Sequence, residues 1–128
     1  MQVLFEAIYA RYEATALASK LTELYNTEAP ADAVFPYGVF SLVSDVSGEG
    51  EFEVDTENCL VQFNLFSEKT LATEVCDVFK ALKTAFDHYD LTIVGYEIIS
   101  LEREVANLIR VEKIWQFNVT YRLLFEKE

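Results

Sequence analysis

The chain has 128 residues and a mass of 14.7 kDa, a size typical of one domain with a single hydrophobic core. Its 52% apolar content, with ten phenylalanines, seven tyrosines and one tryptophan, excludes an intrinsically disordered chain. Acidic residues outnumber basic ones by 22 to 10, so the net charge of −12 argues against sequence-specific binding of nucleic acids, which needs clustered lysine and arginine.

The hydrophobic pattern predicts helices and strands in one domain, 1–128. The expected elements are, in chain order, a helix at 2–12, its continuation or a second short turn at 15–20, a short strand at 21–25, a connection at 26–36, strands at 37–46 and 59–66 on either side of a loop at 47–58, a helix at 68–87, a strand at 91–101, an extended turn or hairpin rim at 102–112, and a last strand at 113–126. Antiparallel neighbours need only a short connection, so the strands beside the loop are expected to form a hairpin.

The last strand has the clearest pattern in the chain. Large apolar residues occupy the odd positions: Trp115, Phe117, Val119, Tyr121, Leu123 and Phe125. Mostly polar residues, among them Gln116, Asn118 and Thr120, lie between them. Because side chains on a strand alternate between faces, this segment can cover a core with one face and turn a polar row to solvent or a partner with the other.

The helix at 68–87 is the best candidate to cover that apolar row. Leu71, Val75, Val78 and Leu82 recur at spacings of three and four, which is typical of an amphipathic helix. We expect Ser67 to cap its first turn, since a serine hydroxyl can accept a hydrogen bond from a free amide there.

The order of elements predicts an α+β fold, with a mainly antiparallel four-to-five-stranded sheet packed by an N-terminal helix and one central amphipathic helix. The helices are expected to lie mostly on one face. Cys59 and Cys76 lack the paired spacing of a zinc site or a disulfide scaffold and are expected to be buried free thiols. The sequence has no signal peptide and no apolar run of about 18 residues, which favours a soluble protein made in a reducing cytoplasm, with no membrane partner.

No residue pattern predicts catalysis, a metal site or a cofactor. The segment 45–56 resembles a calcium loop through Gly50 at its sixth position, but Glu49 and Thr56 do not fit the ligand pattern, and strands rather than helices flank it. His88 is the single histidine and has no identifiable nucleophile beside it. We therefore expect a protein that is not an enzyme.

Charge is distributed unevenly along the sequence. Residues 21–68 contain no lysine or arginine and ten acidic residues, among them Glu49, Glu51, Glu53 and Asp55. A mixed-charge cluster is expected around the last turn, formed by Arg103, Glu104, Arg110, Glu112 and Lys113. This cluster is either a solvated hairpin rim or an intersubunit contact in which Arg103 and Arg110 meet the acidic segment of a neighbouring copy. A head-to-tail contact of this kind closes into a ring if its rotation allows.

The overall pattern resembles the tail-completion, or tail-terminator, proteins of long-tailed bacteriophages and related prophages. The resemblance covers nearly the whole chain and rests on these residues: Leu4, Ala7, Ile8 and Tyr9; Ala29 and Pro30; Phe35, Pro36 and Tyr37; Val61, Gln62 and Phe63; Phe66 and Ser67; Trp115, Val119, Tyr121 and Arg122. None of them is a catalytic signature.

The resemblance implies a structural virion protein that forms a ring, typically of six copies, at the head-proximal end of the tail tube. Such a ring terminates tube polymerisation and joins the tail to the head connector. Its implied partners are itself, the tail tube protein and the head connector protein, and DNA only passes through its bore. Its implied location is the virion, after assembly in the cytoplasm of a bacterial host.

Two other interpretations stay open at this stage. The chain could be another protein of the head-to-tail connection, such as a head-closure or minor tail protein, or a cytosolic protein-binding module outside any virus. A ring protein is expected to self-associate or to bind a tube protein, whereas a binding module is expected to stay monomeric or dimeric.

Overall fold

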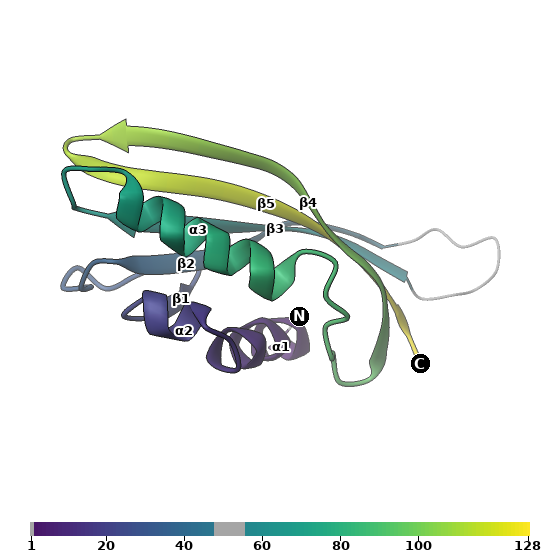
Figure 1. The fold of residues 1–128 in the computed structure, drawn as a ribbon. Helices are drawn as coiled ribbons and strands as arrows, with labels where there is room; N and C mark the ends of the chain where they lie inside the picture. The colour runs from purple at the N-terminus through teal and green to yellow at the C-terminus, as the bar shows by residue number, and fades with distance from the viewer. Residues whose placement is uncertain (1, 48–55) are drawn as a thin grey trace.

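A computed structural model describes residues 2–47 and 56–128 of the chain. Its elements are α1 (Gln2–Glu13), α2 (Leu17–Lys20), β1 (Leu24–Asn26), β2 (Tyr37–Ser47), β3 (Thr56–Ser67), α3 (Thr73–Phe86), β4 (Tyr96–Val111) and β5 (Ile114–Lys127). The five strands form one sheet in the order β1-β2-β3-β5-β4, and the three helices lie on one face of it (Figure 1). The expected α+β class and the one-sided placement of the helices are confirmed.

The sheet is mixed rather than purely antiparallel. β2 pairs with β3, β3 with β5 and β5 with β4, all antiparallel, and the hairpin expected between β2 and β3 is present. β1 pairs with β2 in parallel over Gly38, Val39 and Phe40. A strand of only three residues has no alternation long enough to indicate its direction, so this pairing was not expected from sequence.

The core lies between the helices and the central strand pair β3–β5. The five odd positions from Phe117 to Phe125 are buried as expected, and Trp115 is half-buried. Phe63 of β3 lies opposite Val119 at the centre. Its ring lies 5.0 Å from that of Phe86 on α3 and 5.7 Å from that of Tyr121, in centroid distances. This row therefore fixes where α3 packs.

α3 begins later than the sequence predicted. Its first residue is Thr73, and its N-terminal cap is Ala72, which makes no side-chain capping bond. Ser67 is wrong as a cap because it is still paired with Trp115 as the last residue of β3. It is fully buried there, and its hydroxyl donates a 2.7 Å hydrogen bond to Glu74 in the first turn of α3. Ser67 thus anchors the helix from the strand.

β4 also differs from the prediction. The strand expected at 91–101 begins only at Tyr96, and the segment expected to be a turn or rim, 102–112, continues the strand to Val111. The turn consists of Glu112 and Lys113, both with positive φ, as a tight two-residue hairpin requires. Two bulges, between Ile98 and Ser100 and near Glu104, interrupt the alternation by which a strand is recognised.

The two cysteines differ in environment. Cys59 is fully buried, and burial raises the pKa of its thiol to about 12. Cys76 is exposed, which corrects the expectation that both are buried, because it falls on the solvent side of α3. Both are free thiols. None of the helices in the described ranges is long and apolar enough to cross a membrane.

The native protein is expected to react with an aromatic disulfide reagent at one thiol only. Cys76 reacts rapidly because it is exposed, whereas Cys59 reacts only when the protein unfolds. Absorbance of the released thiolate, followed with and without denaturant, counts the thiols. Two rapid thiols in the native protein would contradict the packing of Cys59.

Phe63→Ala is expected to lower the free energy of unfolding by about 3–5 kcal/mol, because it empties the centre of the core. Urea denaturation followed by far-UV circular dichroism measures the change. Val94→Ala is the control, since Val94 is exposed and its truncation should change stability little. Equal losses for the two variants would contradict the assignment of the core.

Candidate interaction surface

The face of the sheet opposite the helices carries an uncharged polar strip. It crosses the three strands β3, β5 and β4, and its members are Gln62, Asn64, Asn107, Gln116, Asn118 and Thr120. Within it, Gln62 donates to Asn64 at 2.9 Å and Gln116 donates to Asn118 at 2.6 Å. We call this set the amide strip. Its neutrality stands out in a chain of net charge −12, and a neutral hydrogen-bonding surface suits contact with another protein.

An aromatic patch adjoins the amide strip at the end of the sheet where β2 begins. It consists of Tyr25, Phe35, Tyr37 and Phe66, all half-buried. The Tyr37 ring stacks on Phe66 with a centroid distance of 5.0 Å, and Phe35 and Tyr25 lie 5.0 and 6.0 Å from Tyr37. Half-buried aromatic rings beside neutral amides are typical of the central part of a protein interface.

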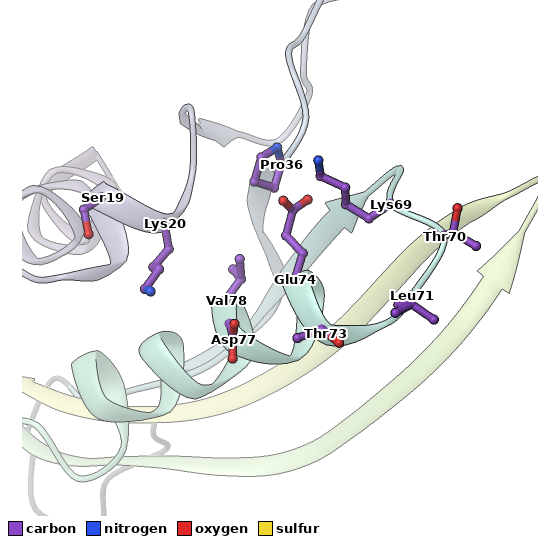
Figure 2. A pocket seen from close by; sticks show the side chains of 10 residues that line it. All are labelled: Ser19, Lys20, Pro36, Lys69, Thr70, Leu71, Thr73, Glu74, Asp77 and Val78. Carbon is purple, nitrogen blue, oxygen red and sulfur yellow. The ribbon is translucent and has the colours of Figure 1, made fainter.

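A groove of about 720 Å³ opens on the helix-covered side, between α2 and the start of α3. Figure 2 shows its side chains: Lys20, Pro36 and Lys69 surround Glu74 and Asp77 of α3. Glu74 is already held by Ser67. No group of three or more histidine, cysteine or acidic side chains that could hold a metal ion occurs within residues 2–47 and 56–128.

Arg103 of β4 lies beside the C-terminal end of α3 and contacts other residues of the same chain. Its guanidinium forms an ion pair with Asp87 at 3.3 Å and lies 5.6 Å from the centre of the Phe79 ring. Asp87 also accepts a hydrogen bond from the hydroxyl of Tyr121, a fully buried residue. Burial, followed by the contact with Asp87, raises the pKa of Tyr121. Arg103 therefore balances the negative charge of Asp87, and Asp87 in turn is the hydrogen-bond acceptor for the buried Tyr121 hydroxyl.

Arg110 lies at the other end of α3. Its guanidinium is 4.7 Å from the centre of the Trp115 ring and donates to the Thr70 carbonyl at 3.1 Å, and the Trp115 indole donates to the same oxygen. These contacts join the β4–β5 hairpin to the segment that precedes α3. A helix of 14 residues separates the two arginines by about 21 Å. The expected single cluster around the last turn is therefore wrong for Arg103.

The acidic members of the expected contact, Glu49, Glu51, Glu53 and Asp55, lie outside the described residues. Ser47 and Thr56, which flank them, lie at the opposite end of the sheet from the turn between β4 and β5 (Figure 1). Sequence reasoning identified the polar row of β5 as a possible partner surface. It missed the aromatic patch, because this patch combines residues from β1, β2, β3 and a connecting loop.

Comparison with known proteins identifies a shared fold. The sequence matches no known family model, and no curated protein matches it. A chain in the solved structure described as the virion of a native gene transfer agent particle superposes with a TM-score of 0.78. The alignment covers 93% of this chain and 91% of that chain, at 18% sequence identity. The two chains therefore have the same fold.

Asp87→Ala is expected to destabilise the protein by about 1–3 kcal/mol, because it leaves the buried Tyr121 hydroxyl without its acceptor. Thermal or urea denaturation measures the loss. Asp90→Ala removes an exposed carboxylate three positions away and serves as the control, with little change expected. If Asp87→Ala and Asp90→Ala had the same free energy of unfolding, the hydrogen bond between Asp87 and Tyr121 would make no net contribution to stability.

Proposed function

We propose that this chain is a non-enzymatic structural protein of a phage-like virion, and specifically the tail terminator. In this role, copies of the chain form a ring at the head-proximal end of the tail tube, stop tube polymerisation and join the tube to the head connector. The proposal is supported chiefly by the fold shared with a chain of a gene transfer agent virion, over more than nine-tenths of both chains. The sequence resemblance to tail-terminator proteins gives the finer assignment.

The surfaces of the chain fit a part of a larger assembly. In the part of the chain that the structure describes, the helices leave one face of the sheet uncovered (Figure 1). This face presents the amide strip and the aromatic patch. Such a face is suited to binding other subunits, whether a second copy, the tube protein or the connector. A net charge of −12 keeps the unassembled subunit soluble, and acidic walls would not retain the phosphate backbone of DNA passing through a bore.

The contact between copies is proposed to use opposite charges. In a ring, the acidic segment containing Glu49, Glu51, Glu53 and Asp55 meets the strand β4 of the next copy, which carries Arg103 and Arg110. Arg110 is the better candidate of the two arginines, since its partners within the chain are the Thr70 carbonyl and the Trp115 ring rather than a carboxylate. Charge reversal of Arg103 would break its ion pair with Asp87, so it tests stability rather than assembly.

A second position in the same particle is supported by the same shared fold. A head-closure or minor tail protein would also be a small α+β subunit of the head-to-tail joint, and the likeness to a virion chain favours it equally. The partner distinguishes the two roles, because a terminator acts on the tail tube protein and a head-closure protein acts on the connector.

The purified protein is expected to form closed rings as its concentration rises, and to cap one end of polymerising tubes. Light scattering over a wide concentration range gives the mass, and negative-stain images of the same samples show the rings. Added to the tail tube protein of the same virus during polymerisation, the chain should shorten the tubes and remain bound at one end. A strict monomer that leaves tube length unchanged would contradict the terminator role.

A further inference from the structure

Two stretches of sheet edge are free of backbone partners within the described part of the chain. β1 covers β2 only at Gly38, Val39 and Phe40, which leaves residues 41–47 uncovered. At the other edge, the backbone N–H of His88 donates to the Leu101 carbonyl at 3.1 Å, so the segment before β4 covers the beginning of that strand. Residues 102–111 of β4 remain uncovered. We call these stretches the free β2 edge and the free β4 edge.

Both free edges carry exposed apolar side chains. The exposed fractions are 52% for Val43 and 60% for Val46 on β2, and 40% for Ile109 and 54% for Val111 on β4. A long unpaired edge with exposed apolar residues is a template for pairing with another strand, and soluble proteins usually protect such edges. At least part of each edge is therefore expected to be covered in the assembled state.

The direction of the strands allows each edge to cover the other in a second copy. β2 is antiparallel to β3, β3 to β5, and β5 to β4, so β2 and β4 run in opposite directions within one chain. When a second copy is placed beside the first in the same orientation, its β2 meets the first copy's β4 as an antiparallel pair. The strand directions therefore suit a second copy of this chain as the occupant of the free β4 edge.

We propose that the free β4 edge of one copy pairs with the free β2 edge of the next, with Asp45 opposite Arg110 and Val46 opposite Ile109. This inference rests on the self-association in the proposed function and assigns the surface that performs it. Asp45 and Arg110 both lie on the helix-covered face, since their partners within the chain are Cys59 and Trp115. Opposite charges therefore meet across the junction.

The apolar pair lies on the other face. Val46 is opposite Asn58 within the chain and Ile109 is opposite Gln116, so both side chains project from the open face. A slip of one residue would place paired side chains on opposite faces. A slip of two would place Asp45 against Leu108 or Glu112 and lose the ion pair. The proposed register places opposite charges on one face and two exposed apolar side chains on the other.

The proposed pairing is staggered. Within one chain, Asp45 is paired with Cys59, Cys59 with Leu123, and Leu123 with Leu101, so Asp45 and Leu101 lie at the same level on the two edges of the sheet. Moving its partner from Leu101 to Arg110 is a shift of nine residues on β4, which match eight residues of β5 because of the bulge near Glu104, or about 26 Å along the strands. The neighbour's hairpin turn then ends beside Leu42, just beyond the part of β2 that β1 covers. Closing a sheet into a ring requires a stagger of this kind.

Disulfide cross-linking tests the register directly. In a Cys76→Ser background, which removes the exposed native thiol, Val46→Cys and Ile109→Cys are combined in one chain. Directly opposite residues on antiparallel strands bring their Cβ atoms to about 4.5–5.5 Å, close enough for a disulfide. Mild oxidation should give a ladder of covalent oligomers on a non-reducing gel, and reductant should collapse it to monomer.

The matched control combines Val46→Cys with Val105→Cys, because Val105 is on the same strand and face and is likewise exposed. It should give no ladder. Equal ladders from both pairs would overturn the register, and the absence of a ladder from Val46→Cys/Ile109→Cys, in free protein and in capped tubes, would overturn the edge pairing. Tubes that are capped without any cross-link would overturn this interface and leave the proposed function standing.

Discussion

The antiparallel pairing of β3 with β5 is the constraint on which the rest of the structure depends. Twelve consecutive residue pairs join the two strands, and their helix-facing positions form the apolar row through Phe63 and Val119. Every helix packs onto this row or onto its neighbours because burial of large apolar side chains dominates the free energy of folding. The ring of Phe79 stacks on Phe117 at 4.0 Å and so sets α3 along the same strand.

Polar contacts then fix how the elements sit around that row. Ser67 and Arg110 hold the segment before α3, and the Arg103–Asp87–Tyr121 contacts hold its C-terminal end. Arg11 of α1 donates to the Ala85 carbonyl at 2.8 Å and lies over the Tyr89 ring, which ties the first helix to the same end of α3. Arg11 and Arg103 thus serve the subunit itself, and the sheet edges, including Arg110, and the open face are the candidate surfaces for assembly.

The parts that could be predicted from sequence are those whose pattern is regular and local. β5 alternates without interruption, and α1 and β2 also have periodic apolar residues, so their existence and extent were correct to within about two residues. The extent of β4 was not predicted correctly, because its two bulges shift the period of alternation and its second half is mostly exposed. That half therefore has no apolar face to recognise. The role of Ser67 depends on its pairing with Trp115 as well as on nearby Glu74. The role of Arg103 depends on the contact between Asp87 and Tyr121, which are 34 residues apart in sequence, so no local pattern could reveal it.

Because helices cover only one face of the sheet, the residues of each central strand fall into two sets with different requirements, one facing the core and one facing the open side. In β5 the odd positions must fill a core, whereas the even positions, such as Asn118 and Thr120, meet only their neighbours on the open face. Substitutions at the even positions can therefore accumulate during evolution without loss of the fold, and each change of partner can be followed by changes on that face alone. This separation permits two chains to share the fold, with a TM-score of 0.78, while only 18% of aligned residues are identical. Among chains that share this fold, sequence differences are then expected to be most frequent on the open face and least frequent in the row beneath the helices.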